Sequence, residues 1–174
     1  MAPKTPLPIV FGAMTFGREG EEQVRTSKLE DCAQILDTFQ HYGHNEIDTS
    51  RFYGVSPMPF AGQIVTNFTQ GGSSEEYLKQ LNWPDRKLIM DTKFFPNTMG
   101  YMGKPVEHLT PADMRKGLET SLEVLGTQKV DLWYLHAPDR SVPLEETLKG
   151  VNELFKEGKF ERWGISNFMA WEGM

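Results

Sequence analysis

The sequence predicts an α/β protein, a partial (β/α)8 TIM barrel with about five βα units. Short apolar runs alternate with helical patterns, the order typical of βαβ units and a parallel sheet. Polar residues follow the ends of successive predicted strands, where barrel enzymes build their sites. An open doubly wound sheet is the alternative, but the first βα turn has Gly12 and Gly17 without a G-x-G-x-x-G motif. We therefore favour the barrel.

Each predicted strand is a short apolar run bounded by glycine or polar residues. The strands cover residues 9–16, 46–49, 87–94, 130–136 and 162–167. The stretches between them are long enough for helices, and parallel strands need such crossovers.

The predicted helices combine a 3.6-residue apolar period with start and stop signals. They run from Ser27 to Gly43, from Ser73 or Ser74 through Leu81, from Thr110 to Gly126, and over residues 143–157. Ser27 with Glu30, and Thr110 with Asp113, have the capping-box spacing. Pro111 suits a first helical turn.

Length and composition limit the class of protein. The chain has 174 residues, which suits one domain over 1–174, and is 39% hydrophobic and 24% charged. Its net charge of −6 argues against a nucleic-acid partner. The single cysteine, Cys32, allows no intramolecular disulfide and is expected to be a buried thiol. Without a signal-peptide pattern or a membrane-spanning run, a cytoplasmic location is expected.

Four ionisable residues lie at or just past predicted strand ends: Asp48, Tyr53, Lys93 and His136. Adjacent barrel strands bring their ends into one pocket. An ammonium group beside a phenol favours the phenolate, an aspartate orients the ammonium, and an imidazole can bind the same carbonyl oxygen. This set can protonate an oxygen while hydride arrives at carbon.

Each of these residues also has a structural interpretation. A single tyrosine is usually a half-buried surface aromatic group, a lysine at a strand end is usually solvated, and an aspartate can stabilise a turn. Taken singly, the structural interpretation is favoured. The four together, in a βα pattern, favour catalysis.

Several longer stretches resemble the aldo-keto reductase family. They are EIDTSRFYG, IMDTKF, VDLWYLHAPD and GKFERWGISNF. The stretches FGAMTFG, LETSLEVLG, PDRSVPLEETL and NFMAWE are most similar to the aflatoxin-aldehyde reductase branch. The similarity extends over the chain except residues 55–70.

The resemblance implies NADPH-dependent reduction of an aldehyde or ketone to an alcohol. Tyr53 would be the general acid, assisted by Lys93 and His136, with Asp48 paired to Lys93. Cofactor contacts would come from Ser166 and Asn167, which would bind the nicotinamide carboxamide, and from Asp48, Met14 and Thr15. The substrate would be a small carbonyl compound, from either a detoxification or a secondary-metabolite pathway.

The sequence departs from the family pattern in two places. About three βα units of the barrel are expected to be missing beyond Met174, together with the loop for the adenosine 2′-phosphate. Residues 55–70 are an atypical insertion between Tyr53-Gly54 and the next helix start, interpreted either as a substrate loop or as a surface loop.

A third hypothesis is that residues 55–70 and the final Glu172-Gly173-Met174 are translated intron sequence, since their codons can contain splice signals. The alternative to an enzyme is therefore a truncated, non-catalytic protein or a half-barrel interaction partner. A homodimer through the open barrel edges is a further expectation.

Overall fold

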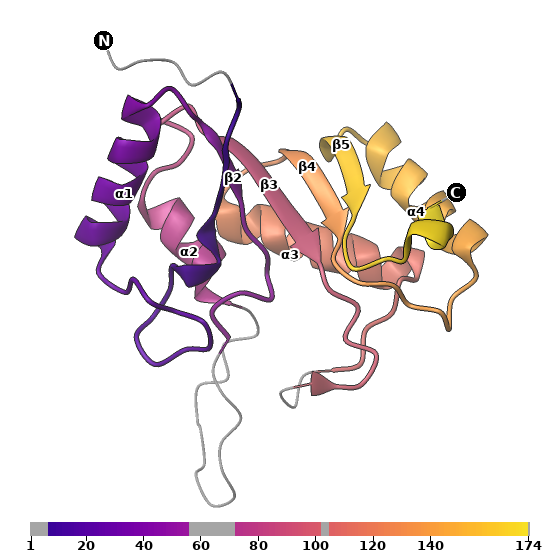
Figure 1. Ribbon diagram of the computed structural model, residues 1–174. Helices are drawn as coiled ribbons and strands as arrows, with labels where there is room; N and C mark the ends of the chain where they lie inside the picture. The colour runs from indigo at the N-terminus through magenta and orange to yellow at the C-terminus, as the bar shows by residue number, and fades with distance from the viewer. Residues whose placement is uncertain (1–6, 56–71, 102–104, 174) are drawn as a thin grey trace, which may run out of the picture. The chain divides into compact units, whose positions relative to one another are not determined.

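A computed structural model describes residues 7–55, 72–101 and 105–173 (Figure 1). Strands and helices alternate along the chain as the hydrophobic pattern predicts. The order is β1 (Val10–Gly12), η1 (Ala13–Thr15), α1 (Leu29–His41), β2 (Glu46–Asp48), α2 (Ser73–Gln80), β3 (Ile89–Phe94), α3 (Pro111–Leu125), β4 (Val130–Leu135), α4 (Leu144–Lys156), β5 (Phe160–Ile165) and η3 (Ala170–Gly173).

The five strands form one sheet in chain order, β1-β2-β3-β4-β5. Parallel pairing places Gly12 opposite Asp48 and Asp48 opposite Asp91, while Trp133 lies opposite Trp163. The α/β class and the partial-barrel topology are thus confirmed, with β1 and β5 as the end strands. The chain divides within β3 into two compact units, residues 1–91 and 92–174.

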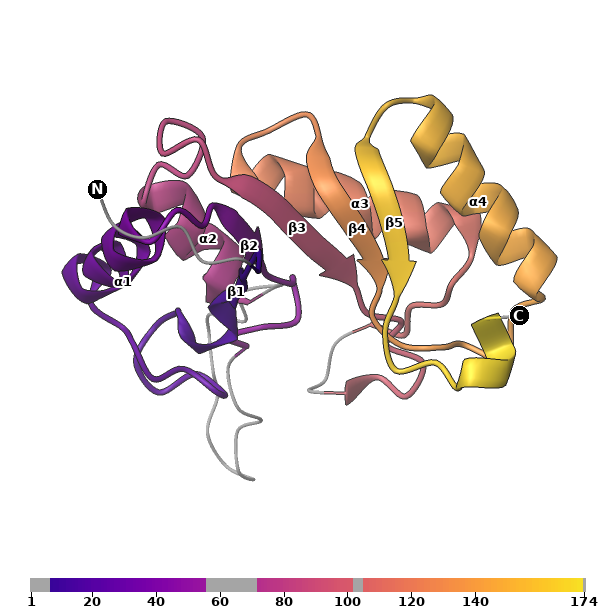
Figure 2. The ribbon, with the colours of Figure 1, turned by 45° about the horizontal axis from the view of Figure 1, so that its top comes forward.

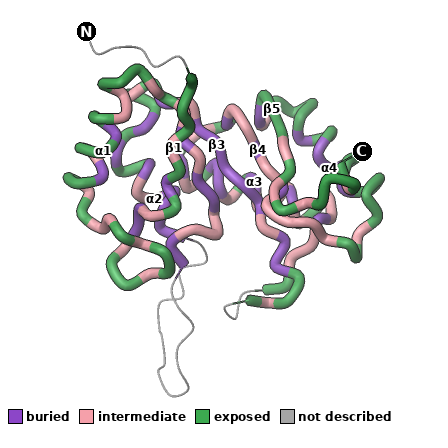
Figure 3. Tube along the Cα trace, in the orientation of Figure 1, coloured by how far each residue is buried: buried purple, intermediate pink, exposed green. Residues whose placement is uncertain are grey.

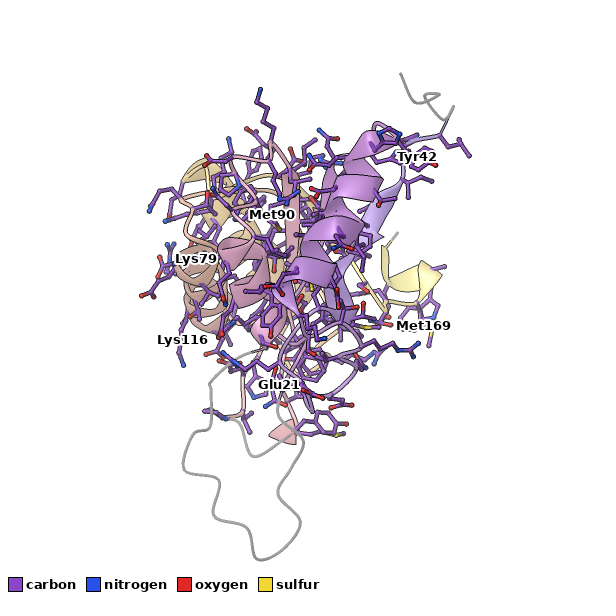
Figure 4. The ribbon with its side chains drawn as sticks, turned by 90° about the vertical axis from the view of Figure 1, so that its left-hand side faces the viewer. Glu21, Tyr42, Lys79, Met90, Lys116 and Met169 are labelled. Carbon is purple, nitrogen blue, oxygen red and sulfur yellow. The ribbon has the colours of Figure 1, made fainter. Side chains whose placement is uncertain are left out.

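In the first unit, α1 and α2 supply the apolar side chains that pack on β1 and β2. Fully buried members of this core are Phe16, Cys32, Leu36, Ile47 and Leu78. Figure 4 shows α1 in front, with Glu21 in the loop before it and Tyr42 at its end. Burial of Cys32 raises the pKa of its thiol to about 11, which agrees with a structural thiol.

In the second unit, α3 and α4 lie beside β4 and β5 (Figure 2). The Trp133 and Phe160 rings pack against each other in a tilted arrangement, with ring centroids 5.3 Å apart, and each residue is only 1% exposed. In contrast, β5 is largely exposed beyond Phe160 (Figure 3).

Several predicted strand boundaries are wrong, most of all those of the first and last strands. The strand expected over residues 9–16 ends at Gly12, because the chain turns into η1, where the Phe16 amide donates to the Ala13 carbonyl (3.0 Å). The last strand covers Phe160–Ile165 rather than residues 162–167, so Ser166 and Asn167 follow it.

Predicted N-caps are correct at one helix and wrong at two. The Thr110 hydroxyl caps α3 by accepting from the Asp113 amide (3.2 Å), and Gly126 ends that helix at φ +72°. Lys28, not Ser27, is the N-cap of α1, and Gly72 is the N-cap of α2. Among the helices in the part of the chain that the structure describes, none has both the length and the apolar character that a membrane crossing requires.

Candidate active site

Lys93 and His136 lie at neighbouring strand ends within the second unit. The His136 amide donates to the Phe94 carbonyl (2.8 Å), which joins the ends of β3 and β4. Lys93 is only 7% exposed, and its Nζ lies 5.8 Å from the centre of the Tyr134 ring. The Phe95 ring meets the imidazole edge-on, with centroids 5.7 Å apart. The backbone and these rings therefore hold both ionisable groups in defined positions.

The His136 imidazole is held in its neutral form. Burial, and secondly the positive charge of Lys93, lowers the pKa of His136 from 6.5 to about 4. Near neutral pH the ring is therefore a hydrogen-bond donor rather than an acid. A neutral imidazole suits polarisation of a carbonyl oxygen.

This lowered pKa predicts a pH-dependent stability. Between about pH 6.5 and pH 4 the unfolded chain binds a proton at His136 that the folded chain does not, so stability from this residue falls as the pH falls. We expect the unfolding free energy of wild type, relative to His136→Gln, to decrease from pH 7 to pH 4.5. Urea titrations of both proteins at the two pH values measure this difference. A constant difference would contradict a depressed pKa.

Ser166 and Asn167 lie directly after β5 and beside His136. The Ser166 amide donates to the Leu135 carbonyl (2.9 Å). Asn167 adopts φ +61°, which asparagine tolerates, and its Nδ2 donates to the His136 carbonyl (2.7 Å) and to Ser166 Oγ (3.1 Å). The side chains of both residues are thus gathered at the ends of β4 and β5.

Asp48 and Tyr53 belong to the first unit. Asp48 ends β2, and Tyr53 follows in the turn over residues 51–54, with its amide donating to the Ser50 carbonyl (3.1 Å). Met14 and Thr15 lie in η1, directly after the strand whose Gly12 pairs with Asp48. Met14 is 38% exposed.

Each unit therefore gathers part of the predicted site. The second brings together Lys93, His136, Ser166 and Asn167, and the first holds Asp48, Tyr53, Met14 and Thr15. Two aromatic neighbours, Phe95 and Tyr134, were missed from sequence. The alternation of side chains along a strand could have found Tyr134, since it shares a strand face with His136 two residues later.

The insertion over residues 55–70 lies outside the described residues except for Val55. Its two ends meet, because the Ser73 amide donates to the Gly54 carbonyl (2.9 Å) and the Gly72 amide donates to the Arg51 carbonyl (2.9 Å). If residues 55–70 were removed, Gly54-Gly71-Gly72-Ser73 would already have the hydrogen bond of a four-residue turn.

We therefore expect a protein lacking residues 55–70 to fold. Shortening the connection recovers roughly 2 kcal/mol of closure entropy, and loss of the buried Val55 side chain costs a similar amount. The unfolding free energy should change by less than about 2 kcal/mol, as measured by urea denaturation. A deletion variant that fails to fold would show that the segment is structurally required.

Comparisons with known proteins identify the family. A family model described as the aldo/keto reductase family matches residues 8–174. The aldo-keto reductase pigE of Monascus ruber is 42% identical over 99% of this chain and 46% of its own length. Human aflatoxin B1 aldehyde reductase member 4 is 36% identical over 94% of this chain and 41% of its own length.

Solved structures show the same fold. A thermostable aldo-keto reductase, crystallised with the inhibitor epalrestat, superposes with a TM-score of 0.67 at 28% identity over 95% of this chain and 51% of its own. An aldo-keto reductase from Klebsiella pneumoniae in complex with NADPH gives 0.65 at 25% identity over 95% and 47%. The chain thus spans about half the length of the relatives it matches.

Proposed function

Because the chain belongs to the aldo/keto reductase family, we propose that it reduces an aldehyde or ketone to an alcohol with NADPH, with Tyr53 as the general acid. One observation carries the proposal most directly. A buried lysine, Lys93, lies beside a histidine, His136, whose imidazole is held neutral. This pair can place positive charge and a hydrogen-bond donor at a carbonyl oxygen.

The proposed roles follow from the chemistry of each side chain. The Tyr53 phenol donates its proton to the oxygen that becomes the alcohol. The charge of Lys93 favours the phenolate that remains, and Asp48 orients the ammonium group. His136 donates to the same carbonyl oxygen and aligns it. When bound, NADPH supplies the hydride.

The residues after β5 fit the nicotinamide end of this cofactor. A carboxamide presents a donor and an acceptor, and the Ser166 hydroxyl and the Asn167 amide offer both. Met14 and Thr15 would contact the cofactor from the loop after β1. We assign no residue of this chain to the adenosine 2′-phosphate. The NADPH complex of the Klebsiella protein and the aldehyde-reductase names of the human relatives support the same cofactor and substrate class.

The test is a titration of the purified chain with NADPH, followed by addition of an aromatic aldehyde. We expect a saturable change in NADPH fluorescence and aldehyde-dependent loss of its absorbance. Binding without turnover would leave only the cofactor part of the proposal, and the absence of both at high cofactor concentration would overturn it for this chain.

An interaction function is the second candidate, favoured by an exposed apolar groove between α4 and β5. Leu148, Val151, Asn152, Phe155 and Trp163 line this groove. Phe155 and Trp163 are 49% and 42% exposed, and a contiguous apolar patch of this kind is typical of an interaction site. We propose that a second copy of the chain covers it, forming a homodimer.

Light scattering after gel filtration tests this assembly. The dimer should have twice the 19.9 kDa mass of the chain, and Trp163→Glu should return it to a monomer. Tyr42→Glu, at a residue 47% exposed in the first unit, is the matched control and should stay dimeric. A monomeric wild type would exclude the proposal.

A further inference from the structure

We propose that Arg51 and Gly72 are positioning residues that hold Tyr53 in place. This inference rests on the proposed role of Tyr53 as general acid. It concerns the turn over residues 51–54 and the start of α2, which are both in the first unit. Neither Arg51 nor Gly72 belongs to the expected catalytic or cofactor-binding set.

The backbone of the Tyr53 turn is hydrogen-bonded to the start of α2 at successive positions. The Gly72 amide donates to the Arg51 carbonyl (2.9 Å), and the Ser73 amide donates to the Gly54 carbonyl (2.9 Å). Between them the Ser74 amide lies 3.5 Å from the Tyr53 carbonyl. The first amides of a helix lack partners within the helix, so the turn uses these donors.

Gly72 allows this close approach. A Cβ atom at position 72 would lie 1.5 Å from the Tyr53 carbonyl oxygen and 2.4 Å from its carbonyl carbon. Gly72 itself has an ordinary φ of −72°, so a larger residue is excluded by space and not by backbone conformation. Because the obstructing atoms are backbone, a change of side-chain rotamer cannot relieve the contact. Any side chain at this position must therefore shift the Tyr53 backbone, the start of α2, or both.

Arg51 adds a side-chain connection between the same two segments. Its Nη1 donates to the Gly72 carbonyl (2.9 Å) and lies 3.4 Å from Glu75 Oε2, while its Nη2 lies 3.9 Å from Glu76 Oε1. The Glu75 side chain is fully buried and the Arg51 side chain only 18% exposed. A buried carboxylate requires a compensating charge, so this pair resists separation.

Both contacts join the Tyr53 turn to the start of α2. Gly72 sets how closely α2 approaches the Tyr53 backbone, and Arg51 binds the carbonyl of Gly72 from the residue two before Tyr53. The phenol is carried by a short turn, so a shift of its backbone moves the hydroxyl. A misplacement of about 1 Å can reduce a rate by about 10²-fold.

The experiment compares Gly72→Ala, Arg51→Met and Arg51→Lys with wild type in aldehyde reduction with NADPH. We expect kcat to fall about 10²-fold in Gly72→Ala and about 10-fold in Arg51→Met, with the NADPH dissociation constant unchanged. Arg51→Lys should recover part of the loss, because it keeps the charge opposite Glu75 but not the planar two-pronged contact.

Arg86→Met is the matched control for Arg51→Met. Arg86 is 23% exposed, pairs with Asp37 (2.5 Å) and donates to the Leu81 carbonyl (3.1 Å), all in the same unit. Arg86→Met should therefore lose stability while its kcat stays unchanged, because these partners of Arg86 lie outside the Tyr53 turn. Equal kcat values in wild type, Gly72→Ala and Arg51→Met would overturn the positioning role.

A spectroscopic readout separates this inference from the proposed function. With 3-fluorotyrosine placed at position 53, Gly72→Ala and Arg51→Met should move or broaden its fluorine resonance, while Arg86→Met should not. If wild type shows no turnover, or Tyr53→Phe retains it, the proposed function fails while the resonance still tests positioning. An unchanged resonance in Gly72→Ala would overturn the inference in either case.

Discussion

Tyr53→Phe should abolish aldehyde reduction while leaving NADPH binding intact. The substitution removes one oxygen atom, and with it the proton that the product alcohol requires. General acid catalysis by a positioned group contributes about 10²–10⁴-fold, so kcat should fall by at least about 10²-fold. Stopped-flow absorbance of NADPH in a single turnover measures the chemical step directly, and fluorescence titration measures binding.

Tyr134→Phe is a suitable control for this result. Tyr134 lies on β4, and its ring faces the Lys93 ammonium at 5.8 Å. Phenylalanine keeps that ring face, so kcat should change less than about threefold. Equal losses of activity in Tyr53→Phe and Tyr134→Phe would mean that the result does not single out Tyr53 as the proton donor. Full activity in Tyr53→Phe would require a different acid.

The order of the elements was predictable because hydrophobic period and glycine or proline breakpoints are local properties. The cap of α3 was predictable for the same reason, since Thr110 and Asp113 are three residues apart. The N-cap of α2, expected at Ser73 or Ser74, was not predictable. The Ser74 hydroxyl donates to the Ala13 carbonyl (2.8 Å) and binds Thr49 (2.9 Å), so tertiary partners have replaced its local one.

The candidate site was likewise predictable from the sequence only in part. Placement of Lys93 and His136 at strand ends needed only the strand boundaries. The neutral state of His136 depends on burial and on a charge from another strand, which spacing alone does not reveal. The approach of Gly72 to Tyr53 joins residues on either side of the insertion. The family resemblance suggests that these segments are neighbours, but the contact between the two backbones is visible only in the structure.

The largest loss of stability is expected from Trp133→Ala. Trp133 is 1% exposed and is the largest fully buried side chain in the protein's described part, and its ring packs at a tilt against Phe160. Its removal loses apolar burial and leaves a cavity between β4, β5 and the helices, with a cost of about 3–5 kcal/mol. Urea denaturation followed by circular dichroism measures the loss without depending on tryptophan fluorescence.

Trp163→Ala supplies the matched control, because Trp163 is directly opposite Trp133 in the β4–β5 register. The two positions share residue type, strand pairing and sheet, but Trp163 is 42% exposed. Its removal should cost less than about 1 kcal/mol, measured at a concentration low enough to keep the chain monomeric. The difference in unfolding free energy between the two variants therefore measures the effect of burial separately from that of strand propensity. Similar losses in both would mean that the helices do not enclose Trp133 as the structure shows.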